Sequence, residues 1–135
     1  MIFRIFVTLA LSLLLTACAE PPYTNVDNSG LQGLLDRDVP LVDVRRPEEW
    51  RETGVVEGSQ LLTFVDESGR LQPGFLETLT QRFSPTDPLV LICRTGSRTD
   101  ALARHLVEKM GYTQVYNVRH GITEWIRKGL PVSRG

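Results

Sequence analysis

The chain has 135 residues, of which 41% are hydrophobic, enough for one domain with a buried core but not for two. Acidic and basic side chains nearly balance, which gives a formal net charge of −1. Without a basic stripe or an acidic tail, this balance argues against nucleic-acid binding and against a disordered chain. We therefore expect partners that are small molecules, and we also expect a monomer.

Residues 1–17 differ from the rest of the chain. Arg4 precedes an apolar run, Ile5 to Leu15, that as a helix would reach only about 16 Å, about half of a hydrocarbon core of roughly 30 Å. This pattern is typical of a secretory signal peptide rather than of a membrane-spanning helix. The segment ends in Leu15-Thr16-Ala17-Cys18, which resembles the lipobox of bacterial lipoproteins. The alternative is an ordinary signal peptide with an incidental cysteine.

The lipoprotein resemblance implies that residues 1–17 are removed and that Cys18 becomes an acylated N-terminus. Several acyl chains would hold the protein at a membrane, since a single chain binds only marginally. The residue after Cys18 is not Asp, which by analogy favours the outer membrane of a bacterium and an extracytoplasmic, periplasmic location. Residues 18–23 would form a tether and residues 24–135 the domain. Cys93 would then be the one free thiol of the mature chain and could not form an internal disulfide.

Short apolar segments alternate with amphipathic ones along the domain. Strands are predicted over residues 40–45, 58–62, 89–92 and 114–118, with a weak edge segment at Val26. Helices are predicted after an N-cap at Asp27, from Pro47 to Gly54, from Pro73 to Phe83, over 97–110 and over 121–128. This order favours a single α/β domain with a largely parallel central sheet and helices on both faces.

The apolar strand over 89–92 stops at Cys93, and a short loop leads from it to a helix. Backbone N–H groups of residues 94–98 can turn inward as an anion-binding nest at the positive end of that helix. Arg94 and Arg98 add forked donors for an oxyanion. Such surroundings favour a thiolate, and sites of parallel sheets lie at the carboxyl ends of strands. A buried cysteine can also be a small apolar residue, but the loop that follows favours a nucleophile over an anion site.

Cys93-Arg94-Thr95-Gly96-Ser97-Arg98 resembles the active-site loop of the rhodanese (thiosulfate sulfurtransferase) family, whose pattern is Cys-Arg-x-Gly-x-Arg/Thr. Residues 41–50, which contain Asp-Val-Arg before a Pro-opened helix, are similar to a second family segment. Residues 117–132 are similar to the closing Asn…Trp…Gly-x-Pro-Val pattern. The three segments occur in the family's order and span about residues 24–133. The resemblance implies a single rhodanese-like domain.

The resemblance also implies a double displacement that needs no cofactor. The Cys93 thiolate would attack the outer sulfur of an anionic donor such as thiosulfate, become a persulfide, and pass the sulfur to a thiophilic acceptor such as cyanide or a thiol. Arg94 and Arg98 would bind the donor and neutralise the departing sulfite. The backbone amides of Thr95, Gly96 and Ser97 would stabilise the persulfide, with Gly96 allowing a close approach.

Other polar residues are expected to be structural. Asp43 and Arg45 would support the loop from the neighbouring strand, and an ion pair remains the alternative role for each loop arginine. The chain departs from the family pattern at residues 54–59, which lack the usual His and Pro, and at His120, which replaces a glycine; both changes concern the substrate-entry surface. Two histidines and one available cysteine, far apart in sequence, predict no metal site.

Two other functions compete with sulfur transfer. Relatives of this fold use a Cys…Arg loop as phosphatases, but their loops are one residue longer than Cys93–Arg98, which fits the sulfurtransferase branch. The other alternative is a non-catalytic sulfur carrier or protein-binding lipoprotein. The intact cysteine and arginines argue against an inactive module but are compatible with a sulfur carrier.

Overall fold

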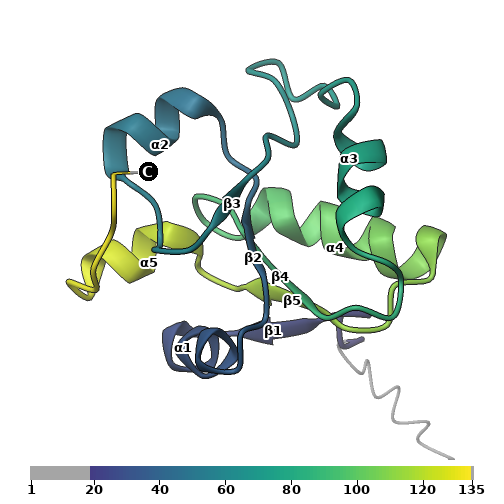
Figure 1. Cartoon of the computed structure of the whole chain (residues 1–135), viewed down its shortest axis with the longest axis horizontal. Coiled ribbons are helices and arrows are strands. Elements are labelled where there is room, and N and C mark those ends of the chain that lie inside the picture. Colours follow the sequence, from purple (N-terminus) through teal and green to yellow (C-terminus); the bar gives the residue numbers. More distant parts are fainter. Residues whose placement is uncertain (1–18, 135) are drawn as a thin grey trace, which may run out of the picture.

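A computed structural model describes residues 19–134 (Figure 1). The predicted signal peptide and the predicted acylation site at Cys18 lie outside these residues. Among residues 19–134, no helix has both the length and the apolar character needed to cross a membrane.

Five strands form one parallel sheet in the order β1-β5-β4-β2-β3. In that order the strands are β1 (Thr24–Val26), β5 (Val115–Val118), β4 (Leu89–Ile92), β2 (Leu41–Asp43) and β3 (Gln60–Leu61). Val90 of the central β4 lies opposite Leu41 on one side and Tyr116 on the other. Because every pairing is parallel, the carboxyl ends of the strands lie at one edge of the sheet, which we call the carboxyl edge.

Helices cover both faces of the sheet (Figure 1). They are α1 (Asn28–Asp36), α2 (Pro47–Thr53), α3 (Phe75–Arg82), α4 (Ser97–Met110) and α5 (Gly121–Arg127). One cluster of buried residues joins α3 and α4 to Leu89 and Leu91, and a second joins α1 and α5 to Val90 and Ile92. Since β4 is covered on both faces, all four of its residues are apolar. The predicted fold class is confirmed.

Several regular elements are shorter than the sequence predicted, among them β2, which is limited to Leu41–Asp43 within the predicted 40–45. β3 is limited to Gln60–Leu61 within the predicted 58–62, at an edge of the sheet. The helix predicted to open at Pro73 begins at Phe75, because Gly74 before it adopts a left-handed conformation with φ of 80°. α2 follows β2 and lies at the carboxyl edge of the sheet, so its residues can reach the Cys93 loop (Figure 1).

Candidate active site

Cys93 directly follows β4 at the carboxyl edge, and its side chain is buried, with 1% of the residue exposed. The loop then turns through Gly96, whose N–H donates a hydrogen bond of 3.1 Å to Cys93 Sγ. Gly96 has φ of 97°, and a Cβ at this position would collide with the backbone carbonyl of Arg119. Only glycine therefore lets the loop bring this amide onto the sulfur.

Backbone hydrogen bonds from the start of α5 hold the loop in place. The N–H groups of Ile122 and Thr123 donate to the carbonyl oxygens of Cys93 and Arg94, at 2.9 and 3.1 Å. Gly121 has φ of 62° and lies against the Arg94 backbone so closely that a Cβ would collide with it. This contact gives a physical reason for a glycine at this point of the closing pattern.

The thiol also contacts a buried polar pair. Thr99 Oγ1 lies 3.2 Å from Cys93 Sγ and donates a hydrogen bond of 2.5 Å to Asn117 Oδ1. Asn117 Nδ2 donates to Gly96 O and to Asn25 Oδ1, both at 3.3 Å. Thr99 comes from the first turn of α4 and Asn117 from β5, so these bonds join the sulfur to two elements on either side of the loop.

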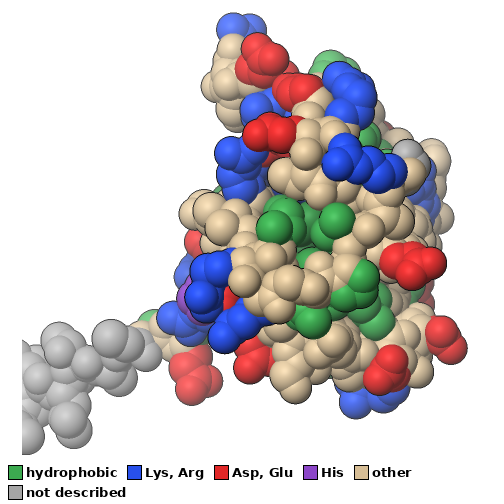
Figure 2. Space-filling view, turned by 90° about the vertical axis from the view of Figure 1, so that its left-hand side faces the viewer, with side chains coloured by type: hydrophobic (Ala, Val, Ile, Leu, Met, Phe, Trp, Pro, Cys, Tyr) green, Lys and Arg blue, Asp and Glu red, His purple; other side chains and the backbone are tan. Residues whose placement is uncertain are grey.

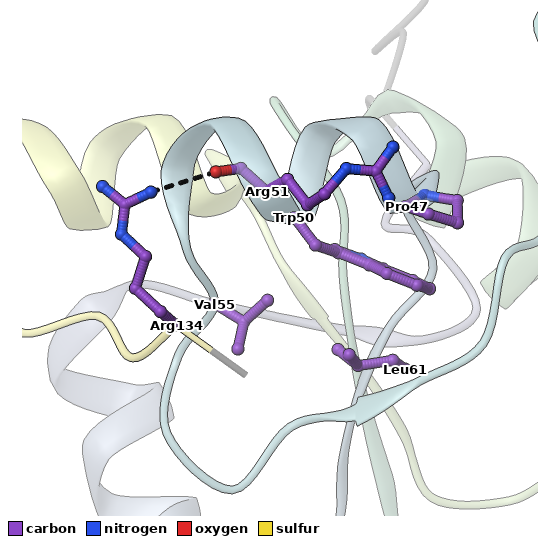
Figure 3. A pocket seen from close by; sticks show the side chains of 6 residues that line it. All are labelled: Pro47, Trp50, Arg51, Val55, Leu61 and Arg134. Atoms are coloured by element: carbon purple, nitrogen blue, oxygen red, sulfur yellow. Dashed lines mark hydrogen bonds between the residues drawn. The ribbon is translucent and has the colours of Figure 1, made fainter.

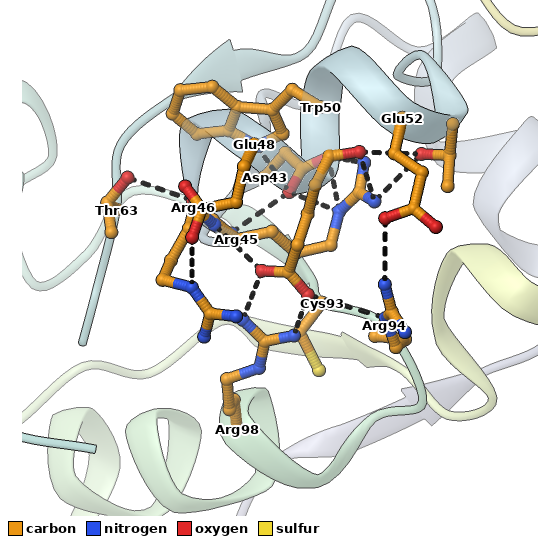
Figure 4. Close-up of polar contacts among 12 residues, drawn as sticks. Asp43, Arg45, Arg46, Glu48, Trp50, Glu52, Thr63, Cys93, Arg94 and Arg98 are labelled. Carbon is orange, nitrogen blue, oxygen red and sulfur yellow. Dashed lines mark hydrogen bonds and ion pairs between the residues drawn. The ribbon is translucent and has the colours of Figure 1, made fainter. Parts of the chain in front are cut away.

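The two loop arginines both contact carboxylates of α2 (Figure 4). Arg98 binds Glu49 through two hydrogen bonds of 2.7 and 2.8 Å. Arg94 lies 3.4 Å from Glu49 and 3.6 Å from Glu52, and 48% of its side chain is exposed, against 23% for Arg98. Arg94 is thus the cation that solvent and a donor reach more readily, whereas Arg98 is engaged within the protein.

Glu49 is ionised at all but the lowest pH. Burial alone would raise the pKa of Glu49, but hydrogen bonds from Arg98 and from the backbone N–H of Arg46 outweigh it and lower that pKa to about 2. The same pairing with Glu49 raises the pKa of Arg98 above its ordinary value, so this guanidinium stays charged. The pair Arg98–Glu49 is therefore a fixed ionic contact beside the thiol.

Asp43 and Arg45 form an ion pair of 2.9 Å in which both side chains are fully buried. Arg45 also donates to Thr53 Oγ1 and to Gly54 O, at 2.9 and 3.0 Å. Trp50 Nε1 donates to Asp43 Oδ1 at 3.1 Å. The pair thus holds the second half of α2, the helix that carries Glu49, against the end of β2.

Thr95 and Ser97 are exposed at the turn of the loop. His120 precedes α5 and lines a shallow hollow together with Asp27, Glu124 and Lys128, a hollow that the thiol does not line. Within residues 19–134, no cluster of His, Cys, Asp or Glu is placed to hold a metal ion.

A hollow of about 420 Å³ lies beside α2 and shares no lining residue with the Cys93 loop (Figure 3). Its walls are Pro47, Trp50, Arg51, Val55, Leu61 and Arg134. The segment that departs from the family pattern reaches this hollow through Val55. Val55 and Ser133 exchange backbone hydrogen bonds of 2.8 and 2.9 Å, which hold the segment against the C-terminal residues. Figure 2 shows apolar side chains gathered on the side of the molecule where α2 and α5 lie, with charged side chains around them.

Sequence reasoning did not single out Glu49, Thr99 or Asn117 as parts of this site. In the sequence, Glu49 lies within the helix predicted from Pro47 to Gly54, and Asn117 is the first residue of the closing pattern. A usable signal for Asn117 was its polarity within the otherwise hydrophobic strand Val115–Val118. For Glu49, the signal was Arg98 at the start of the helix after the loop, because a partly buried guanidinium favours a carboxylate partner.

The chain is similar to a known protein family and to several known proteins. The model of the rhodanese-like domain family matches residues 27–128. A sulfurtransferase of Allochromatium vinosum is 34% identical over 110 residues, which cover 79% of this chain and 92% of that protein. Rhodanese-like domain-containing protein 17 of Arabidopsis thaliana is 29% identical over 122 residues, 87% of this chain and 77% of that protein. The solution structure of the polysulfide-sulfur transferase homodimer of Wolinella succinogenes is similar with a TM-score of 0.64 and 25% identity, covering 83% of this chain and 79% of that one.

Proposed function

Because this chain belongs to the rhodanese-like domain family, we propose that it is a sulfurtransferase that works through a persulfide on Cys93. The donor is a small anion with a sulfane sulfur, such as thiosulfate, and the acceptor is a thiophile such as cyanide or a thiol. The observation that carries this proposal is the position of Cys93: a buried thiol at the carboxyl edge, with the Gly96 amide on its sulfur and Arg94 and Arg98 following it. No cofactor is needed for this chemistry.

The reaction proceeds in two displacements. The Cys93 thiolate attacks the outer sulfur of thiosulfate, the sulfur–sulfur bond of the donor breaks, and sulfite leaves with the electron pair. The acceptor then attacks the outer sulfur of the persulfide, and the Cys93 thiolate is released unchanged. The Gly96 N–H, which donates a hydrogen bond to Cys93 Sγ, stabilises negative charge on that sulfur. The half-exposed Arg94 attracts the donor and the departing sulfite.

A Cys-dependent phosphatase is less well supported. Besides the shorter loop, the guanidinium that would have to hold a phosphate, that of Arg98, makes a two-pronged contact with Glu49. A phosphate would have to displace a carboxylate from that guanidinium.

One experiment separates sulfur transfer, phosphatase activity and an inactive scaffold. The protein is incubated with thiosulfate and its intact mass is measured before and after addition of cyanide. We expect one added sulfur that disappears with cyanide and that Cys93→Ser does not acquire. Hydrolysis of an aryl phosphate without any sulfur adduct would favour the phosphatase. The absence of both reactions would favour the inactive scaffold.

We also propose that an acylated Cys18 tethers the domain to a membrane on the extracytoplasmic side. Tyr23 fixes the start of the domain, because its hydroxyl donates to Asp100 at 2.5 Å and its ring lies 5.8 Å from the guanidinium of Arg104. The chain from Cys18 to Tyr23 spans at most about 17 Å. Tyr23 precedes the first strand at the amino end of the sheet, opposite the carboxyl edge that holds Cys93.

This arrangement would turn Cys93 away from the membrane, so we expect its donor and acceptor to be soluble. Metabolic labelling with a radioactive fatty acid tests the anchor. Labelling of the wild-type protein that Cys18→Ala abolishes supports it, and equal labelling of the two proteins would overturn it.

A further inference from the structure

We infer that Thr99 is a positioning residue whose single hydroxyl proton points to Asn117 when Cys93 is a thiol and turns to the sulfur when Cys93 becomes a thiolate. This inference rests on the proposed function, since it concerns the same nucleophile. It follows from the hydrogen-bond partners of Asn117 and Thr99, both of which are buried.

The carbonyl oxygen of Gly96 sets the orientation of the Asn117 amide. Its Nδ2 faces the carbonyl oxygen of Gly96 at 3.3 Å, and a backbone carbonyl can only accept a hydrogen bond. The amide nitrogen must therefore lie on the Gly96 side. This leaves Oδ1, which can only accept, facing Thr99 Oγ1 at 2.5 Å.

The direction of the Thr99 proton follows from that orientation. Because Asn117 Oδ1 cannot donate, the short bond between these oxygens requires the proton of Thr99. The carbonyl oxygen of Gly96 is a second acceptor for the same hydroxyl, but at 3.3 Å it is the weaker one. The sulfur of Cys93, 3.2 Å from the same oxygen, then faces a lone pair. A lone pair accepts a hydrogen bond from the S–H of a thiol, but it cannot donate a hydrogen bond to a thiolate.

Ionisation of Cys93 reverses this preference. The thiol proton leaves to solvent, and the Thr99 hydroxyl rotates about its Cβ–Oγ1 bond to donate to the thiolate; its own O–H bond is not broken. Rotation leaves Asn117 Oδ1 without that donor in a buried place, which is costly. Asn117 and the thiolate therefore compete for the one proton of Thr99. In the persulfide the charge moves to the outer sulfur, so the hydroxyl returns to Asn117.

The charged groups around Cys93 are the same in each of these states. They are Glu49 of α2, Asp43 and Arg45 at the end of β2, Arg94 of the loop, and Arg98 of α4. From β5 the sulfur is reached through the uncharged Asn117, and α5 contacts the loop through backbone N–H groups of Ile122 and Thr123. Changes at Thr99 and Asn117 therefore alter hydrogen bonding to the sulfur without altering charge.

The test is the rate at which iodoacetamide alkylates Cys93 as a function of pH, read from the Cys93 peptide by mass spectrometry. Asn117→Ala removes the acceptor that competes with the thiolate for the Thr99 proton. At pH values where the wild-type alkylation rate is below half of its high-pH plateau, we therefore expect alkylation of this variant to be roughly 3–10-fold faster than that of the wild type. The same change made in a Thr99→Val background should have no such effect. Thr99→Ser keeps the hydroxyl and should alkylate like the wild type.

Asn25→Ala is the matched control, because it removes the other Nδ2 partner of Asn117 and leaves the bond between Thr99 and Asn117 in place. We expect its alkylation profile to match that of the wild type. An equal acceleration by Asn117→Ala with and without Thr99, or none, would overturn the inference. Alkylation needs no sulfur donor, so a failure of the proposed function, seen as no sulfur adduct from thiosulfate, is distinguishable from a failure here.

A measurement on the wild-type protein covers the case in which Asn117→Ala does not fold. In proton NMR at a pH where Cys93 is a thiol, the Thr99 hydroxyl proton should exchange slowly with water and show a nuclear Overhauser effect to Asn117. An effect to the Cys93 β-protons in place of Asn117 would overturn the inference.

Discussion

Arg98, in the first turn of α4, donates two hydrogen bonds to the carboxylate of Glu49, in the first turn of α2, at 2.7 and 2.8 Å. This contact joins the helix that follows the Cys93 loop to the helix that follows β2 at the carboxyl edge. Arg94 contacts the same carboxylate from the loop itself. Glu49 therefore links both arginines of the loop, and it fixes where their charges lie before a donor arrives.

Removing the charge of Glu49 should destabilise the protein. Glu49→Gln leaves Arg98 without its ionic partner at a site where only 5% of the glutamate side chain is exposed, and we expect a loss of about 1–3 kcal/mol in the free energy of unfolding at pH 7. Urea unfolding measures it. Glu124→Gln is the matched control, since it breaks the exposed pair with Arg127 and should cost less than about 1 kcal/mol. Equal losses for the two variants would contradict this account.

The contribution of Glu49 should also depend on pH. The pKa of Glu49 in the folded protein, about 2, lies below its ordinary value of 4.5, so its stabilising contribution is present above pH 4.5 and is lost as the pH falls towards 2. We expect the difference in unfolding free energy between wild type and Glu49→Gln to be constant from pH 7 to about 5 and to shrink below that. A difference that grows on acidification would contradict the assigned ionisation.

The pair Asp43–Arg45 should behave as a buried ion pair. Arg45→Met leaves the Asp43 carboxylate buried beside Trp50 without its cation, and we expect a loss of about 3–5 kcal/mol. The double variant Asp43→Asn, Arg45→Met removes both charges and should be more stable than Arg45→Met alone. Equilibrium unfolding of the two variants decides; a double variant less stable than the single one would show that the charges are not coupled.

Gly96 should tolerate no side chain. Gly96→Ala would place a Cβ onto the carbonyl of Arg119 and displace the amide that donates to Cys93, so we expect sulfur transfer to fall at least about 100-fold. Gly69→Ala is the control: it has a similar positive φ of 78° but open space around it, and should cost about 1 kcal/mol in stability and no activity. Retained activity in Gly96→Ala would show that the amide contact is dispensable.

Arg94 should act on the donor rather than on the fold. Its side chain is half exposed and its carboxylate contacts, at 3.4 and 3.6 Å, are looser than those of Arg98. For Arg94→Ala we expect kcat/KM for thiosulfate to fall roughly tenfold, because a charge-assisted contact to the anion is lost, with little change in melting temperature. Arg104 is an exposed arginine on α4, and Arg104→Ala should leave kcat/KM unchanged; an equal loss in both variants would point to a general charge effect.

The fold could be predicted from the sequence because its signals are local. The all-apolar run of β4 indicated a strand covered on both faces, and the placement of Cys93 directly after it indicated a position at the carboxyl edge. Both are properties of a few consecutive residues. Gly96 could likewise be predicted from the turn that the loop requires.

The contacts around the thiol could not be predicted in the same way. Glu49 and Arg98 are far apart in sequence, and several other acidic residues were equally available as partners. The bond between Thr99 and Asn117 depends on how α4 packs on β5, which is set by the surrounding core rather than by either residue. These partners become visible only when the elements are placed in space.

The most direct test of the central claim follows one sulfur through Cys93. Thiosulfate labelled only in its outer sulfur is mixed with the protein in a single turnover, and cyanide is then added. We expect the label to appear first on the Cys93 peptide and then to move quantitatively into thiocyanate, while Cys93→Ser acquires no label. Label that reaches thiocyanate without passing through Cys93, or that never leaves thiosulfate, would contradict it.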